Sequence, residues 1–234
     1  MDETSTTLLP LFPLALVLVP GELLPLHIFE ERYKALMRDA LEGGRRFGLS
    51  YVARAEVGVD TPPPVGSVGC EAQITAVIPL AEGRMNILSV GSGRYVVRGY
   101  AQFEPFLVAE VTKFADEPDD SPETADLAAR VRALFDRLAV AARTLSNEAG
   151  EQVQPQLDVA PEALSFLVAA NIALDSATKQ QMLETTATRP RLESIETRLV
   201  ELVDTYEYRA EMHARTKSNG HGRKAPEFED EDEE

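Results

Sequence analysis

Apolar and polar positions change their spacing twice along the chain, and the three patterns predict different structures. Between residues 8 and 114, short apolar runs are separated by turn residues, which is typical of strands. Between 121 and 216, apolar residues recur every three or four positions, as on one face of an α-helix. Residues 217–234 are mostly charged or small. We therefore expect a β-rich part, a helical part and a disordered charged tail with these bounds.

The β-rich part contains one exception to the strand pattern. Between 30 and 42, the apolar residues stand three, four, seven and eight positions after Tyr33, which predicts a helix that Gly43-Gly44 ends. Turns are expected at Gly83-Arg84 and at Gly91-Ser92-Gly93. The predicted strands are 14–19, 24–29, 46–52, 68–79, 85–90, 94–98 and 103–114. Short strands at this spacing favour a small barrel or a strongly curved sheet.

The helical part has recognisable helix starts. Ser121 is a residue type that favours the N-cap of a helix, and Pro122 is favoured at the first helical position. The helix that begins here is expected to end near residues 147–150. A second helix is expected from Pro161 to about residue 173. A third helix is expected to begin at an N-cap at residue 175 or 176 and to end at about 186, and a long fourth helix is expected from Pro190. Core packing is the favoured interpretation of the last helix's apolar stripe, and a homodimer seam is the alternative. The stripe comprises Leu192, Ile195, Leu199, Leu202, Val203 and Tyr206.

Charge is distributed unevenly over these parts. The formal net charge is −16, of which residues 1–115 contribute −3, residues 116–216 contribute −9 and residues 217–234 contribute −4. Proteins that bind a phosphate backbone gain affinity by neutralising phosphates with Lys and Arg. An acidic chain repels that backbone, so no nucleic-acid partner is expected.

Candidate chemistry is sparse. Cys70 is the single cysteine, and no histidine has a Cys or His partner at metal-ligand spacing. P-loop and Gly-x-Ser-x-Gly motifs are absent from the sequence. We predict a non-enzyme without metal or cofactor. The apolar run at 8–19 follows two acidic residues and is interrupted by prolines, so we expect neither a signal peptide nor a membrane span, and a cytoplasmic location.

Several spaced motifs resemble the N-terminal, substrate-binding domain of Lon protease. The first is Leu9-Pro10-Leu11-Phe12-Pro13-Leu14 followed by residues 19–30, Val-Pro-Gly-Glu-Leu-Leu-Pro-Leu-His-Ile-Phe-Glu, and by Arg32-Tyr33. Val65-Gly66-Ser67-Val68-Gly69-Cys70 and residues 84–95 resemble the family's following strand and hairpin. Lys179-Gln180-Gln181-Met182-Leu183-Glu184 and Arg191-Leu192 resemble its helical motifs. The resemblance covers about residues 8–205.

The resemblance implies an α+β fold, in which an N-terminal β-rich, PUA-like pseudo-barrel with one helix is followed by a C-terminal helical bundle. It implies a non-catalytic module that binds unfolded or partly folded protein segments, as an adaptor or holdase. Full-length Lon continues into ATPase and peptidase domains that this sequence does not contain, so the chain resembles the stand-alone bacterial Lon-N proteins. RNA binding, known for other PUA-like proteins, is the alternative function.

Two binding modes are open to such a module. An extended peptide can add to an exposed sheet edge, or exposed hydrophobic side chains can enter an apolar groove. The segment around His27 and the helix that follows would border either surface. The candidate peptide-binding residues are His27, Phe29, Glu31, Arg32 and Arg38. The competing interpretation is that Phe29, Tyr33 and Met37 are core residues that join the helix to the sheet.

Overall fold

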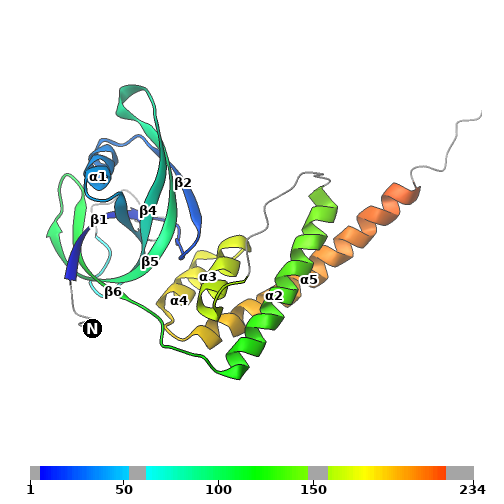
Figure 1. Cartoon of the computed structure of the whole chain (residues 1–234). Helices are drawn as coiled ribbons and strands as arrows, with labels where there is room; N and C mark the ends of the chain where they lie inside the picture. Colours follow the sequence, from blue (N-terminus) through cyan, green and yellow to red (C-terminus); the bar gives the residue numbers. More distant parts are fainter. Residues whose placement is uncertain (1–5, 53–61, 147–157, 220–234) are drawn as a thin grey trace, which may run out of the picture. The chain divides into compact units, whose positions relative to one another are not determined.

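The computed structural model describes residues 6–52, 62–146 and 158–219, and within them a β-rich part with one helix is followed by helices (Figure 1). The elements in chain order are β1 (Thr6–Leu14), β2 (Leu23–Ile28), α1 (Glu31–Glu42), β3 (Arg46–Tyr51), β4 (Val68–Pro79), β5 (Met85–Gln102), β6 (Leu107–Phe114), α2 (Pro122–Ser146), α3 (Pro161–Asn171), α4 (Ser176–Glu184) and α5 (Thr188–Asn219). The predicted fold class is confirmed. The predicted tail lies, from residue 220 onward, outside the described residues.

The strands form a closed mixed sheet. β5 pairs with β4, and the ladder continues through β3 and β1 to β6, which pairs back onto β5. Among the strands of the described residues, β1 and β3 form the one parallel pair. Closure removes open edges that could pair with other chains. β2 is the exception, because it pairs with β5 alone and ends the sheet.

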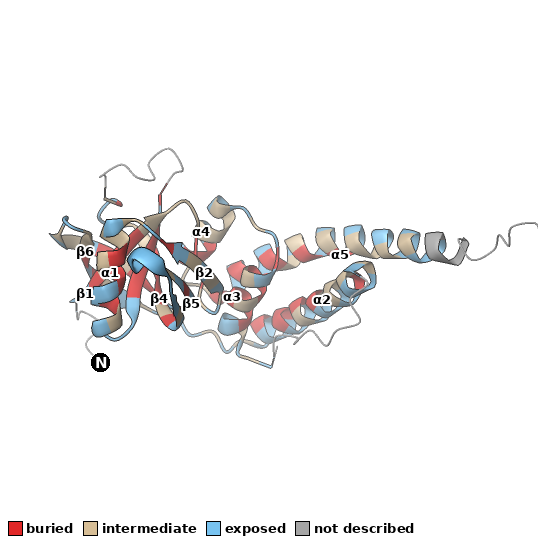
Figure 2. Cartoon of the chain, turned by 90° about the horizontal axis from the view of Figure 1, so that it is seen from above, coloured by how far each residue is buried: buried red, intermediate tan, exposed pale blue. Residues whose placement is uncertain are grey.

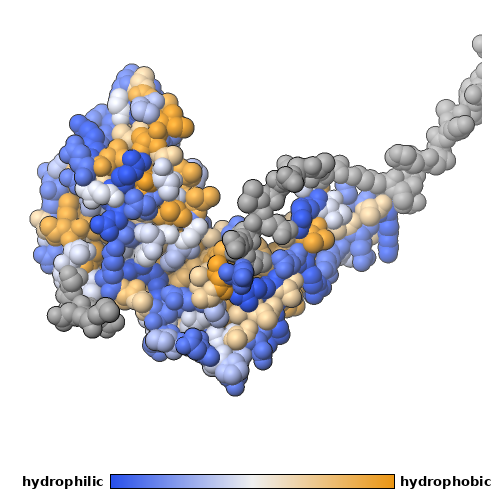
Figure 3. Space-filling view, in the orientation of Figure 1, coloured by the Kyte–Doolittle hydropathy of each residue, from blue (hydrophilic) through white to orange (hydrophobic). Residues whose placement is uncertain are grey.

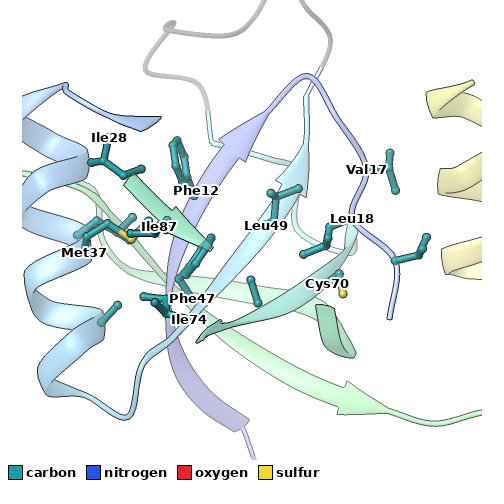
Figure 4. Close-up of a cluster of buried hydrophobic side chains, with 14 of the residues drawn as sticks. Phe12, Val17, Leu18, Ile28, Met37, Phe47, Leu49, Cys70, Ile74 and Ile87 are labelled. Atoms are coloured by element: carbon teal, nitrogen blue, oxygen red, sulfur yellow. The ribbon is translucent and has the colours of Figure 1, made fainter. Parts of the chain in front are cut away.

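The larger group of core side chains joins α1 to the strands. Met37 of α1 lies beside Ile28 and Ile87, and all three are buried (Figure 4). Tyr33 packs against the same group from the side and is partly buried. The core interpretation is therefore right for Met37 and in part for Tyr33, whereas Phe29 lies outside the core, with 58% of its surface exposed.

A second group of core side chains surrounds Tyr95 inside the barrel. The Tyr95 hydroxyl group shares a 2.9 Å hydrogen bond with the Ser50 hydroxyl group, and burial raises the pKa of Tyr95. Two glycines make room for the ring. A Cβ on Gly69 would stand 2.3 Å from the hydroxyl oxygen of Tyr95, and one on Gly48 would stand 2.7 Å from it.

The strand predicted at 14–19 is wrong. β1 lies upstream of it, and residues 15–19 run outside the ladder although Val17, Leu18 and Val19 are buried. The backbone of Val19 finds local partners instead: its N–H donates to the Glu22 carboxylate at 3.1 Å, and its carbonyl oxygen accepts from the Glu22 N–H at 3.1 Å. A continuous apolar run therefore indicated burial here without indicating strand pairing.

The turn predicted at Gly91-Ser92-Gly93 is also wrong, because β5 continues through it. Ala72 pairs with Gly91 and Glu71 with Gly93, so Ser92 is an extra residue that forms a β-bulge. The Ser92 hydroxyl group donates to the Glu71 carbonyl oxygen at 3.1 Å. Glycine is needed at 91, since a Cβ there would stand 2.2 Å from the carbonyl oxygen of Val19.

The predicted helix starts are confirmed for three helices, and α3 begins at Pro161 as expected. The Ser121 hydroxyl group accepts from the Thr124 N–H at 3.3 Å, and the Asp175 carboxylate accepts from the Thr178 N–H at 2.9 Å. The last helix begins at Thr188, two residues before the predicted start.

Two compact units divide the described residues. The first contains the sheet, α1, the start of α2 up to Ala129, α3, α4 and the start of α5 up to Ile195. The second consists of α2 from Arg130 and α5 from Glu196. The domain bounds expected at 114 and 121 remain predictions.

Within the first unit, a buried carboxylate joins the sheet to the helices. Arg94 of β5 and Arg191 of α5 both donate to the carboxylate group of Asp116, and none of the three side chains is more than 3% exposed. Both guanidinium groups also donate to the Thr185 carbonyl oxygen, at 2.8 and 2.7 Å. The Phe166 ring of α3 lies 5.2 and 4.3 Å from their central carbons. The cluster thus connects β5, the segment after β6, α3 and α5.

Replacement of Asp116 by alanine should lower the free energy of unfolding by about 3–5 kcal/mol, because two buried guanidinium groups lose their counter-charge. Urea unfolding followed by circular dichroism measures the change. Glu201→Ala is the matched control: it breaks the exposed 2.8 Å pair between Glu201 and Arg198 and should cost at most about 1 kcal/mol. Equal losses in the two variants would contradict a special role for Asp116.

Candidate functional site

β2 presents two chemically distinct sides. Leu24, Leu26 and Ile28 pack toward the core, whereas Leu23, Pro25 and His27 point outward, as the alternation along a strand requires. Phe29 follows directly and is exposed. Three of the four residues on the outward side, Leu23, Pro25 and Phe29, are apolar, which is unusual for the solvated side of a strand.

The register extends this surface over two more strands. Pro25 stands opposite Leu88 of β5, which stands opposite Ala76 of β4. In the next row, His27 stands opposite Asn86, which stands opposite Ile78. Residues directly opposite each other in a ladder place their side chains on the same face. The two rows therefore form one continuous surface.

We call this surface the outer patch. Its large hydrophobic members are between 36% and 63% exposed, and Figure 3 shows hydrophobic residues along this side of the barrel. It is made of Leu23, Pro25, His27, Phe29, Ala76, Ile78, Leu80, Asn86 and Leu88. Contiguous exposed apolar surfaces of this kind mark interaction sites.

The two polar members of the outer patch, His27 and Asn86, are hydrogen-bonded to each other. His27 Nδ1 and Asn86 Oδ1 are 2.6 Å apart, so the ring donates through Nδ1 when the amide oxygen accepts. In the neutral ring Nε2 is then left as an acceptor. The imidazole also stacks on Phe29, with ring centroids 5.8 Å apart. Of the five candidate residues, His27 and Phe29 are thus brought together with the apolar side chains.

The other three candidates lie on α1 and are held by local contacts. Arg32 Nε donates to Glu30 at 3.1 Å, and its guanidinium group lies 4.7 Å from the Tyr33 ring centroid. Lys34, 2.8 Å away, lowers the pKa of Glu31. Arg38 Nε donates to the Lys34 carbonyl oxygen at 3.3 Å. Glu31 and Arg32 begin the helix that follows Phe29, and Arg38 lies about 9 Å further along it than Arg32.

Lys34 is a supporting residue that the sequence pattern did not single out. Its buried Nζ donates to Glu31 at 2.8 Å and to the carbonyl oxygen of Glu82 at 2.8 Å. Glu82 lies in the turn between β4 and β5 and has a left-handed backbone, with φ of 61°. Lys34 therefore ties α1 to the tip of the hairpin that carries Ile78 and Leu88.

The open edge of β2 is interrupted at its middle. The Gly91 N–H donates to the Glu22 carbonyl oxygen at 2.9 Å, so Glu22 is a residue whose backbone bonds to β5. Bonded positions alternate, so the backbone groups of Leu23, Pro25 and His27 face away from β5. Proline has no N–H to donate. An added strand could bond fully to either end of this edge but not to its centre.

The described residues contain neither a reactive cysteine nor a metal-ligand cluster. Cys70 is buried, and burial raises the pKa of its thiol to about 12, which keeps it protonated. Among the residues that the structure describes, no cluster of His, Cys, Asp and Glu could hold a metal ion. None of the helices in the described ranges has the length and apolar character needed to cross a membrane.

Comparison with known proteins identifies the family. Residues 8–201 match the profile described as the ATP-dependent protease La (LON) substrate-binding domain. The chain belongs to this family. Among curated relatives of this LON domain, the Lon proteases of Desulfovibrio desulfuricans and Anaeromyxobacter dehalogenans are 29% and 27% identical to it over 212 and 195 residues. These matches cover 88% and 82% of the chain but 23% of each relative, so the chain spans about a quarter of their length.

Two solved structures share the fold of this LON substrate-binding domain. The Lon N-terminal domain protein from Xanthomonas campestris is 28% identical, with a TM-score of 0.56, over 81% of this chain and 96% of that one. The N-terminal domain of the Mycobacterium avium complex Lon protease has a TM-score of 0.60 over 85% of this chain and 98% of its own. At 22% identity, the second comparison bears on the fold alone.

Native Cys70 should resist alkylation by iodoacetamide at neutral pH and react once urea unfolds the chain. Folding holds the thiol protonated up to a pH of about 12, whereas an unfolded thiol ionises at about pH 8.5. Because the folded pKa is the higher one, stability is also expected to fall as the pH rises from the unfolded value toward the folded one. Mass spectrometry follows the alkylation, and rapid modification of the folded chain would contradict the prediction.

Proposed function

We propose that this LON substrate-binding domain is a non-catalytic recognition module that binds exposed apolar segments of unfolded or damaged proteins on the outer patch. In this role it acts as an adaptor or holdase, which binds its clients without cleaving them. The observation that carries the proposal is the outer patch itself, a contiguous apolar surface over three strands of a domain whose family is described as substrate-binding.

The apolar face supports binding through side chains. Native proteins bury most large hydrophobic residues, and unfolded segments expose them. Covering Leu23, Ile78 or Leu88 with such a segment removes apolar surface from water on both partners, which stabilises a complex without a specific sequence. Burial of one such side chain contributes about 1.5–3 kcal/mol. A few contacts of this size correspond to micromolar affinity after the cost of association.

The strand edge is the weaker of the two binding modes. Addition of a peptide strand gains affinity from successive main-chain hydrogen bonds, and Pro25 removes the donor at the centre of the β2 edge. The patch face needs no such donors. His27 adds one polar contact, because its Nε2 can accept from a client N–H group. Glu31 and Arg32, at the start of α1, supply charge of both signs next to the patch.

A double variant, Ile78→Asp with Leu88→Asp, should weaken binding of a permanently unfolded client by at least about tenfold, since each carboxylate must be desolvated against the client. Fluorescence anisotropy of labelled, reduced and carboxymethylated lactalbumin measures the affinity. Suppression of aggregation of a heat-denatured enzyme, followed by light scattering, should be lost in parallel.

Val65→Asp is the matched control for the double variant. Val65 is 63% exposed and precedes β4, whereas Ile78 lies at the other end of that strand. The control removes a similar exposed hydrophobic residue and should leave client affinity unchanged. Equal weakening by both changes, or no client binding by the unaltered chain, would overturn the proposal.

Pro25→Val separates the two binding modes. Valine keeps an apolar side chain on the patch and restores an N–H on the open edge. Binding through the face should therefore change less than about threefold, whereas strand addition should become clearly tighter with the extra main-chain hydrogen bond. The same anisotropy assay measures both outcomes, and a marked gain in affinity would show that the edge carries the interaction.

A further inference from the structure

The second unit has apolar side chains that its two helices cover incompletely. α2 from Arg130 and α5 from Glu196 run parallel, and ion pairs join Arg130 to Glu196 at 2.7 Å and Arg137 to Glu207 at 2.9 Å. In this unit the buried hydrophobic residues are Val131, Phe135, Ala141, Leu199 and Val203. Leu134, Leu138, Leu145, Leu202 and Tyr206 belong to the same stripes but are only half-buried. Figure 2 shows burial declining along both helices.

An open groove of about 440 Å³ runs between the two helices. Ala141 of α2 and Ala210 of α5 contribute small side chains, which allow a third helix to approach closely. Val140, also lining the groove, is 57% exposed. Val200, 45% exposed, stands seven residues before Glu207, another lining residue, and so lies on the same face of α5.

The two helices carry opposite charge along this unit. From residue 130 to 146, α2 has four arginines and one aspartate. From residue 196 to 211, α5 has five acidic and two basic residues. A second copy of the unit, related to the first by a two-fold axis that runs parallel to the helices, brings its α5 against α2 of the first copy and its α2 against α5. Basic and acidic helices then face each other twice, as a two-fold interface requires.

We propose that a second copy of this chain docks on the groove between α2 and α5, so that the two helix pairs form a four-helix interface. The interface covers the groove and the exposed side chains of Val140 and Val200. An unfolded client is a poorer occupant, because it lacks the pair of basic and acidic helices that the second copy provides. The inference is independent of the proposed function, since it concerns another surface and its test measures mass.

Analytical ultracentrifugation of the full chain over a micromolar concentration series tests the inference. The unaltered chain should sediment as a dimer, and Val140→Glu should shift the dissociation constant by at least about tenfold toward monomer. Val65→Glu is the matched control, because Val65 is 63% exposed and belongs to the first unit, away from the groove residues. It should remain dimeric.

A charge exchange gives a second, independent readout. Arg132→Glu with Arg143→Glu makes α2 acidic, and Glu201→Lys with Asp204→Lys makes α5 basic, while the ion pairs of Arg130 and Arg137 stay intact. Each variant alone should be monomeric, and an equimolar mixture should form a heterodimer. A monomeric unaltered chain, a dimer that Val140→Glu leaves unchanged, or a mixture that does not associate would each overturn the inference.

Discussion

The placement of the helices in the first unit depends on one buried carboxylate. Asp116 lies between Arg94 and Arg191, and a buried charge of either sign is costly unless it is paired and hydrogen-bonded. The two cations share one anion, so their remaining donors need further acceptors. The Thr185 carbonyl oxygen takes one donor from each guanidinium group, and the Phe166 ring offers its face to both. Because these partners come from different elements, the cluster is satisfied only when the sheet and the helices are assembled together.

β5 connects this cluster to the outer patch. Residues 85–90 pair with β2, and residues 94–102 pair with β6, so one strand serves two neighbours on the same side. The change of partner occurs at the bulge of Ser92. Asn86 and Leu88 lie before the bulge and belong to the patch, whereas Arg94 lies after it and reaches Asp116. The position of the patch is therefore set by the same strand that anchors the helices.

The sequence predicts the order of elements better than it predicts the patch. Helix starts and the long β4 strand follow from caps and alternation, because those signals are local. The sequence points to His27 and Phe29 because they lie in the segment that resembles the opening of the Lon N-terminal domain. Ile78 and Leu88 were missed, since an outward apolar residue looks like a core residue until the register with β2 is known. The bulge at Ser92 was read as a turn for a similar reason: glycine marks both a turn and a close backbone approach, and only the proximity of Val19 separates them.

An exposed apolar face on a sheet carries a hazard of its own, because an open edge beside it can recruit further strands and aggregate. The barrel limits this hazard by closing five of its six strands, which leaves β2 as the open one. Pro25 then interrupts that edge at its centre while its ring still contributes to the apolar face. The same residue thus keeps the surface hydrophobic and discourages strand pairing. A surface built in this way can present apolar side chains to other chains and still avoid becoming a template for sheet growth.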